Sequence, residues 1–596
     1  MGLFLAACAA PQGGPGTPDR APLTESHLYL AKNGPSAAGQ VFELPSAPSR
    51  GARVVLVSQA ARPVSAALRC DGPVRLQLGG EGHHVRAGAR RIFTLPHKRA
   101  QPAELMLPPG VNQCLLEWGE GHRIELARAA RVAPRVAAMD RAAQACPPPP
   151  AAGGDALAAA FFATRDLSQT CPMPTGAFRL LPGEVDSLKY RIDKLTGGNI
   201  SAARLTSGDP DMPLDFANAP HFDEIVLSHL LIRADMAGYL VSRALAFHAA
   251  RGTRVRIMTT GGLTRPFDRR LYEALAAQYP NVQLQYYRYP ARSPGDIVAS
   301  LQRSNHVKLF LGLSPEPGRS FAIMGGRNLS DGFHLEGRAN YPDHPFLHSY
   351  GLEADGFEGL VFHSIYDDFD LALTGDAQVA RLAQHFAKYW WRDGPTQALA
   401  PGGAAAAGPA AGAGGQMRHF LSLPFADGQA QEALFVDLFD AARREIAVIS
   451  PFNYPPPAIE AALQRAAARG VQVRIITRRG GDEPPAAGTR ALNAQFLEDN
   501  HDRYEMRVYA RTERLLHAKI IVIDGRLGMV TSTNLNFRSF VHDTENGIMF
   551  LDRAVAAGLL AEFERFWVTG EDIETFDHIR VLRRVFDALP GILQFF

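Results

Sequence analysis

A short motif that occurs twice constrains the fold of this 596-residue chain more than any other feature. The later copy contains His517, Lys519, Asp524, Ser532 and Asn534, and the earlier copy contains His306, Lys308 and Asn328. In each copy the histidine and the lysine are two residues apart, so on a strand both side chains point to the same face. Two such strands facing each other would surround one small volume with two imidazoles and two ammonium groups. That volume suits a phosphodiester, because one imidazole can attack phosphorus, the other can protonate the leaving oxygen, and the lysines neutralise the remaining oxygens.

The segments that precede the two motifs are repeated as well. An Ala-Ala-Arg-Gly sequence followed by an apolar run occurs at 249–259 and again at 467–477. Each copy reads as a helix end, a glycine stop and a buried strand. Further strand candidates, 224–231 and 445–452, lie upstream of each copy. The order helix, strand, helix, strand and then the His/Lys strand therefore occurs twice, which predicts two α/β lobes.

This doubled pattern resembles the phospholipase D superfamily, whose signature is HxKx4D with a following Asn. The resemblance covers roughly residues 178–596 and is closest to the bacterial cardiolipin synthase-like branch. It implies two phospholipase D-like lobes in a pseudo-twofold arrangement. It also implies phosphoryl transfer through a phosphohistidine, with no metal and no cofactor. By the habit of the family, His306 would be the nucleophile and His517 the acid.

The resemblance also implies roles for the other motif residues. The residues expected to bind the phosphoryl oxygens are Lys308, Lys519, Asn328 and Asn534, with Ser532 nearby. Asp368 or Asp370 in the first lobe, and Glu545 in the second, would hold the two imidazoles in orientation, as carboxylates do for catalytic histidines. Asp524 belongs to the catalytic motif, although the resemblance places it at the strand end rather than at the phosphate.

The first copy of the motif departs from the family pattern. Leu313 occupies the place of the expected aspartate, and the turn-forming segment 314–319 lengthens the path to Asn328. We expect an extended hairpin turn there. Because His306, Lys308 and Asn328 all remain, the first lobe is expected to be catalytic, with a degenerate, binding-only lobe as the alternative.

Composition divides the chain into further units. Residues 25–135 alternate apolar and polar positions in short runs between turn formers, which predicts a small all-β, sandwich-like domain. The predicted units are 1–24 (lipoprotein signal, tether and spacer), 25–135 (β domain), 136–177 (Pro-rich connector), 178–393 (first lobe), 394–416 (Ala/Gly-rich linker) and 417–596 (second lobe). The fold class is therefore α/β with an N-terminal all-β domain.

Charge and hydropathy limit the classes of partner that the protein is expected to bind. The net charge is +2 and no long run of Lys or Arg occurs, which argues against a nucleic-acid partner. The sequence contains no run of eighteen or more apolar residues, so no transmembrane helix is predicted. An insertion at 329–365 carries His334, His344, His348 and His363; we expect it to form a solvated rim of the active site, with a metal site as the alternative.

The positions of the cysteines indicate the cellular compartment in which the protein folds. Leu-Ala-Ala-Cys8 resembles a bacterial lipobox, in which Cys8 would carry a lipid. The other four cysteines, Cys70, Cys114, Cys146 and Cys171, all precede the lobes, and an even number suits two disulfides in an oxidising compartment. Of the three possible pairings, Cys70–Cys114 with Cys146–Cys171 keeps both bonds local; reduced cytosolic thiols are the alternative. The expected location is the bacterial cell envelope, facing the periplasm.

Together these features predict an enzyme that acts on glycerophospholipids at a membrane surface with a monomeric catalytic unit. It would be a cardiolipin synthase-like phosphatidyltransferase or a phospholipase D. The alternatives are a secreted nuclease or other phosphodiesterase, and a non-catalytic lipid-binding envelope protein. The sequence leaves open whether water or an alcohol is the acceptor, because that depends on pocket shape and water exclusion.

Overall fold

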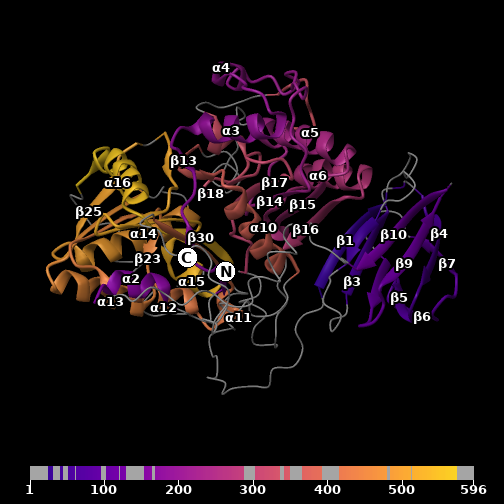
Figure 1. Cartoon of the computed structure of the whole chain (residues 1–596), viewed down its shortest axis with the longest axis horizontal. Coiled ribbons are helices and arrows are strands. Elements are labelled where there is room, and N and C mark those ends of the chain that lie inside the picture. The colour runs from indigo at the N-terminus through magenta and orange to yellow at the C-terminus, as the bar shows by residue number, and fades with distance from the viewer. Residues whose placement is uncertain are drawn as a thin grey trace.

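The structure is a computed structural model of the chain. It describes residues 24–30, 41–44, 52–58, 60, 62–95, 103–119, 121–128, 154–163, 168–287, 303–335, 341–348, 365–391, 415–478, 484–511 and 513–572. These residues form a mixed α/β protein, which confirms the predicted class (Figure 1). Cys8, Cys146 and the greater part of the predicted linker 394–416 lie outside the described residues.

The first lobe contains a seven-strand portion of a large mixed sheet. In spatial order its strands are β13 (Phe178–Leu181), β20 (Asp370–Leu373), β18 (Phe321–Gly325), β17 (Leu309–Leu313), β14 (Glu224–Ser228), β15 (Arg254–Thr260) and β16 (Val282–Tyr287). Its main helices are α3 (Glu184–Thr196), α5 (Met236–Ala250), α6 (Pro266–Gln278) and α10 (Asp376–Trp391). The central strands are apolar runs buried along their whole length, as expected where helices cover both faces of a sheet.

The second lobe repeats this order of strands. The corresponding strands are β21 (Gln416–Ser422), β30 (Glu545–Leu551), β28 (Leu527–Thr531), β27 (Ile520–Ile523), β22 (Glu445–Ile449), β24 (Gln472–Arg478) and β25 (Glu505–Tyr509). Its main helices are α12 (Ala430–Ala441), α13 (Pro457–Ala468), α14 (Pro484–Asn500) and α16 (Arg553–Trp567). Strand by strand, each position in one sheet therefore has a counterpart in the other.

The predicted glycine stops occur in both lobes. Helices α5 and α13 end two residues before Gly252 and Gly470, whose φ angles are 91° and 83°. A residue without a Cβ adopts such angles at little cost, so the chain reverses there and enters the next buried strand. The helix, glycine and strand pattern read from the sequence is thus confirmed.

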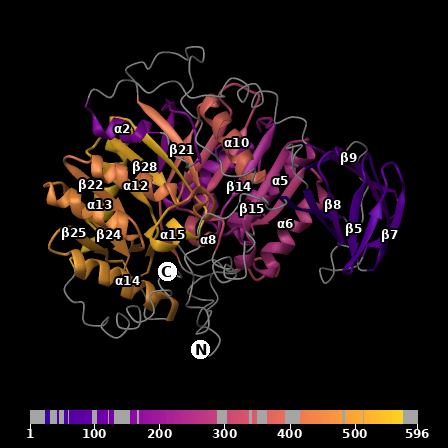
Figure 2. The ribbon, with the colours of Figure 1, turned by 90° about the horizontal axis from the view of Figure 1, so that it is seen from below.

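One apolar core joins the two lobes. Helix α10 packs on β17 and β18 of the first lobe, and α16 packs on β27 and β28 of the second. Side chains of both helices and both sheets, among them Phe386 and Phe563, belong to the same buried cluster. Seen from below, the two lobes lie side by side (Figure 2). Separate outer cores lie under the remaining helices of each lobe.

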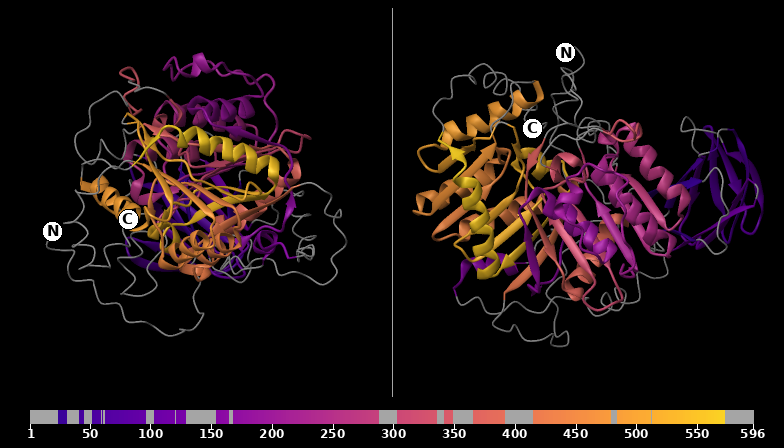
Figure 3. Two further views of the ribbon diagram at one scale, coloured as in Figure 1. Left: turned by 90° about the vertical axis from the view of Figure 1, so that its left-hand side faces the viewer. Right: turned by 90° about the horizontal axis from the view of Figure 1, so that it is seen from above.

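Every described element between residues 24 and 128 is a strand, in line with the predicted all-β domain. The strands are β1 (Thr24–Leu30), β2 (Val41–Leu44), β3 (Ala52–Ser58), β4 (Val64–Cys70), β5 (Val74–Leu78), β6 (Glu81–Val85), β7 (Arg91–Leu95), β8 (Ala103–Leu107), β9 (Gln113–Trp118) and β10 (His122–Arg128). They form two sheets around one core, at one end of the molecule (Figure 3). Strand β1 also pairs with β16, at His27 and Leu284, so one of these sheets continues the sheet of the first lobe. The pairing covers backbone groups that the edge strand β16 would otherwise expose.

The predicted connector, 136–177, contributes to the second lobe. Its described part contains α2 (Ala156–Phe162), β11 (Ser168–Gln169) and β12 (Met173–Pro174). Helix α2 packs on α12, and both short strands pair with β21. The second lobe is therefore completed by residues that precede the first lobe in the chain.

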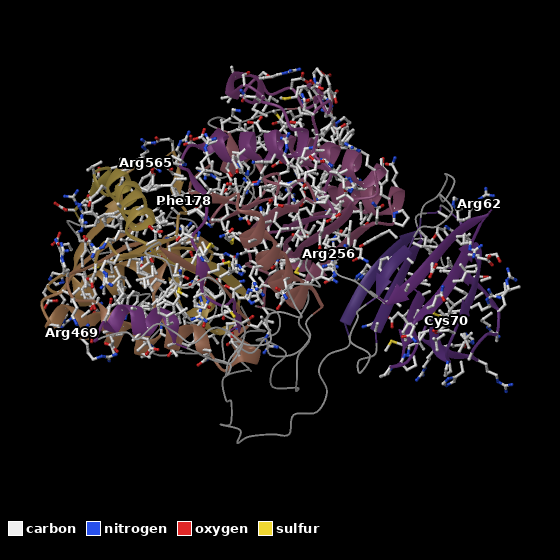
Figure 4. The ribbon with its side chains drawn as sticks, viewed as in Figure 1. Arg62, Cys70, Phe178, Arg256, Arg469 and Arg565 are labelled. Atoms are coloured by element: carbon white, nitrogen blue, oxygen red, sulfur yellow. A yellow bond between two sulfur atoms is a disulfide. The ribbon has the colours of Figure 1, made fainter. Side chains whose placement is uncertain are left out.

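A disulfide crosses one sheet of the strand domain. Cys70 in β4 and Cys114 in β9 are directly opposite each other in the strand register and are bonded (Figure 4 labels Cys70). Cys171 is disulfide-bonded as well. Within the described residues, no helix combines the length and the apolarity that a bilayer crossing requires.

Candidate active site

The imidazole of His306 lies against a carboxylate from the opposite lobe. His306 precedes β17 in the first lobe, and Glu545 opens β30 in the second. Nδ1 of His306 is 2.9 Å from Oε1 and 2.8 Å from Oε2 of Glu545. The imidazole is 5% exposed and the carboxylate is fully buried. This contact fixes the ring orientation and directs Nε2 away from Glu545.

The imidazole of His517 has the reciprocal arrangement. Its Nδ1 lies 2.6 Å from Oδ2 of Asp368, which belongs to the first lobe and is buried. The rings of Phe333 and Tyr366 pack edge-on against this imidazole, with centroids 5.2 and 5.3 Å away. Each histidine is therefore held by a carboxylate that the other lobe supplies.

The strand registers show why Asp368 and not Asp370 takes this position. Gly325 pairs with Asp370 in the first lobe, and Thr531 pairs with Gly547 in the second. Two residues before Asp370 and Gly547 stand Asp368 and Glu545, which are thus structural counterparts. Asp370 instead binds the Arg191 guanidinium and the hydroxyl of Ser187 inside the first lobe.

Gly326 permits the close approach of Asp368. A Cβ at Gly326 would come within 2.1 Å of Oδ1 of Asp368. At the equivalent place in the second lobe stands Ser532, whose hydroxyl donates to Oε2 of Glu545. Gly326 therefore leaves room for the carboxylate of Asp368, whereas its counterpart Ser532 hydrogen-bonds to the carboxylate of Glu545.

Backbone pairing between the lobes sets the histidines in register. The N–H of His306 donates to the carbonyl of Thr544 over 2.9 Å, and the N–H of Thr544 donates to that of Ser304 over 3.0 Å. In the other half, β26 (Leu515–Leu516) pairs in parallel with β19 (Tyr366–Asp367). His517 continues this ladder with a 2.8 Å bond to the carbonyl of Asp367. Each histidine thus sits on a short inter-lobe ladder beside its carboxylate.

The motif lysines are buried beside these pairs. Nζ of Lys308 lies 3.1 Å from the carbonyl of His306, and Nζ of Lys519 lies 2.9 Å from Nδ1 of His517. Asn328 accepts a 3.2 Å hydrogen bond from the N–H of Leu231. Oδ1 of Asn534 is buried and has no hydrogen-bond partner among the described residues.

Burial governs the protonation of the site. Burial and the Lys308 ammonium hold the pKa of His306 well below its usual value. Burial and the Lys519 ammonium do the same to the pKa of His517. Burial also raises the pKa of Glu545 to about 7 and lowers the pKa of Lys308 to about 8. Both imidazoles are therefore neutral at neutral pH, as a nucleophile or base requires.

Asp524 lies away from the phosphate-binding groups. Asp524 follows β27, whereas Lys519 precedes that strand. The carboxylate of Asp524 accepts hydrogen bonds from the backbone N–H groups of Arg443, Arg444 and Glu445. Its role is to close a strand end, so its inclusion among the catalytic residues is not supported by its position. In the first lobe the counterpart position, Leu313, keeps the strand end through a backbone bond from Asp223. The predicted hairpin turn after Leu313 connects β17 and β18.

The predicted solvated rim is wrong for His334, which is fully buried beneath the site. His344 lies 2.9 Å from Asp211, and His348 lies 3.3 Å from the buried carboxylate of Asp268. These histidines do not converge on one point among the described residues, and each serves the packing of the insertion.

Asn546, which sequence reasoning missed, joins the lobes directly behind His306. Its Oδ1 accepts the N–H of Lys308 over 2.9 Å, and its Nδ2 donates to the carbonyl of Lys308 over 3.4 Å. Tyr389 contributes a second inter-lobe contact, because its hydroxyl lies 2.7 Å from Oγ1 of Thr544. Only the adjacency of Asn546 to Glu545 in the sequence could have pointed to it.

One group of donors could ligate a cation. A nitrogen of His306 and carboxylate oxygens of Asp543 and Glu545 all lie within 4.8 Å of one another. Asp543 already binds the guanidinium of Arg538 over 3.0 Å, and Glu545 holds the imidazole. The existing partners thus use the same donor groups that a metal would need.

Comparison with known proteins places the second lobe in a family. Residues 435–567 match the family described as "Cardiolipin synthase, PLD-like domain". The probable cardiolipin synthase YwiE of Bacillus subtilis is 28% identical over 132 residues, 22% of this chain and 25% of that protein. The cardiolipin synthase of Geobacillus kaustophilus is 24% identical over 357 residues, 59% of this chain and 63% of that protein. The matches thus span a quarter to less than two thirds of these relatives.

Among solved structures, a phosphatidylserine synthase from Haemophilus influenzae Rd KW20 aligns with a TM-score of 0.49 at 12% identity, covering 71% of this chain and 97% of that one. The doubled His/Lys motif and the family match at 435–567 agree with each other. Over residues 435–567 the chain thus contains a phospholipase D-like domain, and it is similar to cardiolipin synthases.

Proposed function

We propose that this protein is a phosphatidyltransferase that moves a phosphatidyl group from a glycerophospholipid to an acceptor hydroxyl through a phosphohistidine. The observation that carries the proposal is the pair of buried imidazoles, each held by a carboxylate of the other lobe. The similarity to proteins named cardiolipin synthases supports the lipid class of the substrate. The pseudo-twofold arrangement of the lobes is part of the proposal; the equal strand orders and the reciprocal pairs support it.

In the first step, Nε2 of His306 attacks phosphorus and the bond to the leaving oxygen breaks. For this step His517 takes up a second proton together with the anionic substrate, and its Nε2 gives that proton to the leaving oxygen. The positive charge that develops on His306 is stabilised by the carboxylate of Glu545 at its Nδ1. In the second step, His517 accepts the proton of the incoming hydroxyl, the new P–O bond forms and the P–N bond breaks. The net result exchanges one alcohol for another, with no oxidation or reduction.

The four phosphate-binding residues surround the reacting group in this scheme. Lys308 and Lys519 neutralise its oxygens, and the side-chain NH2 group of Asn534 can donate a hydrogen bond to them. The missing motif aspartate does not weaken the scheme, because Leu313 lies at the far end of β17 from Lys308. A binding-only first lobe is therefore disfavoured, since His306 is buried and partnered as fully as His517.

The proposed place of action is a membrane surface of the bacterial cell envelope. The Cys70–Cys114 disulfide supports an oxidising compartment. The lipid anchor at Cys8 remains a proposal from the sequence. A nuclease or another phosphodiesterase is the second candidate function, because the same histidines serve any phosphodiester.

The test compares purified wild type with His306→Ala and His517→Ala on phosphatidylglycerol vesicles and on DNA, with products separated by thin-layer chromatography. We expect wild type to convert the lipid and not the DNA, and both variants to lose turnover by at least about a thousandfold. With an activated donor whose leaving group needs no acid, His517→Ala should still accumulate the phosphohistidine. Near-normal turnover in His306→Ala would contradict the two-lobe mechanism, and cleavage of DNA alone would favour the second candidate.

A further inference from the structure

The two half-sites differ at three pairs of equivalent positions. The aligned repeats at 249–259 and 467–477 are followed by Thr260 and Arg478, respectively. The register that equates Asp368 with Glu545 also equates Tyr366 with Asp543. Counting from the paired asparagines, Phe333 corresponds to Ser539. The His517 side therefore has a cation and two aromatic rings where the His306 side has a threonine, an acid and a serine.

Arg478 lies at the same end of the sheet as His517. Ile449, Ile476 and Ile520 are neighbours across β22, β24 and β27. Arg478 is two residues beyond Ile476, and His517 is three residues before Ile520 on the antiparallel strand, so both project past the same edge. Burial is the main cause of the lowered pKa values of His517 and Lys519, and the positive charges of Lys308 and Arg478 add to it.

The guanidinium of Arg478 lies between aromatic groups. Its central carbon is 4.2 Å from the ring centre of Phe452, which follows β22. The phenol of Tyr366, which also contacts the imidazole of His517, interacts with it electrostatically. The residue is half-buried, and its buried Nε–H donates to no partner among the described residues. Burial lowers the pKa of this guanidinium to about 10.

Three buried arginines of the first lobe have acidic partners. Arg256 pairs with Glu224 at 2.9 Å, and Arg233 pairs with Asp268 at 2.8 Å (Figure 4 labels Arg256). Arg191 pairs with Asp370 at 3.3 Å. Arg478 has no such ion pair with any residue that the structure describes. The guanidinium of Arg478 is only half-buried, so it keeps part of its hydration, and a ligand anion would supply the counter-charge that it lacks.

The opposite half-site does not suit an anion. Thr260 is occupied by hydrogen bonds with the backbone of Asn305, at 3.0 and 3.3 Å. Asp543, the counterpart of Tyr366, is buried beside His306 and would repel a negative group. The charge asymmetry thus favours an anion on the His517 side only.

We propose that Arg478, flanked by Phe452 and Tyr366, binds an anionic oxygen group, such as a second phosphodiester, on the alcohol that leaves or enters beside His517. This inference rests on the proposed function, in which His517 protonates the leaving alcohol and deprotonates the entering one. The group bound at Arg478 does not react. It positions the hydroxyl of the alcohol for the P–O bond that forms as the P–N bond breaks, with the hydroxyl proton passing to His517.

The consequence is a preference among acceptors. An alcohol that carries its own phosphodiester, as a second phosphatidylglycerol does, gains a charge-assisted contact that water and neutral alcohols lack. The preference should therefore reside in the second step of the reaction and depend on the charge at position 478.

The experiment uses the full-length protein and phosphatidyl-p-nitrophenol as donor in mixed micelles, with the surface charge fixed by an anionic detergent. Release of p-nitrophenol reports the first step. Phosphatidylglycerol and a neutral alkylglycerol are offered together, and their two lipid products are quantified. The variants are Arg478→Gln, Arg478→Lys and, as a control, Arg465→Gln, which removes a surface arginine that pairs with Asp440.

We expect Arg478→Gln to lower transfer to phosphatidylglycerol by at least about tenfold relative to transfer to the alkylglycerol, because charge-assisted hydrogen bonds are of that strength. Arg478→Lys should retain most of the preference, and Arg465→Gln all of it. Release of p-nitrophenol should equal that of wild type in Arg465→Gln, and in the Arg478 variants it is the reference for both products, because Arg478 also affects the pKa of His517. An unchanged product ratio in Arg478→Gln, or an equal loss with both acceptors, would overturn the subsite. No release by wild type, or undiminished release by His306→Ala, would instead refute the proposed function.

Discussion

At the scale of single residues, the site consists of two imidazole–carboxylate pairs with different surroundings. Glu545 receives the hydroxyl of Ser532, whereas Asp368 receives the backbone N–H of Phe369 over 2.7 Å. Burial raises the pKa of both carboxyl groups, since an anion loses hydration when the lobes close around it. The charge of Glu545, whose pKa is about 7, is thus sensitive to pH near neutrality.

The first prediction is a narrow bell-shaped dependence of kcat/KM on pH. Glu545, with a pKa of about 7, must be ionised to stabilise the charge on His306, so activity should fall as pH decreases through about 7. Lys308, with a pKa of about 8, must be protonated to neutralise phosphate, so activity should fall as pH rises through about 8. The measurement is a pH–rate profile of the free enzyme. Lys308→Arg should move the alkaline limb upward, and a flat profile in wild type would contradict both assignments.

At the scale of elements, short strand ends rather than whole sheets align the two lobes. The segment around His306 pairs with Thr544, and β26 pairs with β19. Because each paired segment leads directly into a histidine or a carboxylate, the ladder and the catalytic contact share one register. A shift of one residue would turn the side chains to the other face.

The second prediction concerns Asn546→Ala. This change leaves the N–H and the carbonyl of Lys308 without their side-chain partners, so the free energy of unfolding should decrease by about 1–3 kcal/mol. Turnover should fall by about tenfold or more, because His306 loses its alignment with Glu545. Urea unfolding and steady-state kinetics measure the two effects.

Asn500→Ala is the matched control for Asn546→Ala. The buried Asn500 bonds only within the second lobe, to Glu460 and to the carbonyl of Phe496. Its loss should reduce stability by a similar amount but leave turnover within about twofold. Equal kinetic losses in the two variants would show that Asn546 acts through stability alone.

At the scale of the whole molecule, segments that precede the first lobe in the chain pair with an edge strand of each lobe. Residues before the first lobe complete the edge of the second-lobe sheet through β11 and β12, and β1 covers the edge strand β16 of the first. Both contacts protect strand edges that would otherwise expose unpaired backbone groups. The strand domain stands at one end of this assembly and carries the Cys70–Cys114 disulfide.

The third prediction concerns the compartment in which the chain folds. In an oxidising compartment the Cys70–Cys114 bond should persist, so the natively expressed, denatured protein should not react with a thiol reagent at either residue until it is reduced. Mass spectrometry of the alkylated peptides before and after reduction is the measurement. The same chain expressed in a reducing cytosol is the control. Free alkylation of both cysteines in the native preparation would contradict the envelope assignment and leave the proposed chemistry untouched.

The sequence by itself determined the local features of this protein. The spacing of His306 and Lys308, repeated at His517 and Lys519, and the glycine stops before each buried strand follow from neighbouring residues, because the period of a strand and the φ of a glycine are local properties. The sequence alone also showed that Leu313 stands where the first motif would have its aspartate.

Only the tertiary structure decided which distant residues meet. It assigned Asp368 rather than Asp370 to His517, because the inter-strand register fixes which carboxylate reaches the opposite lobe. It also brought Asn546 to Lys308 and Arg478 to the His517 side. These contacts join residues far apart in the chain, and no period within one segment encodes them. They arise when two sheets of equal strand order close over a common core and bury their charges together.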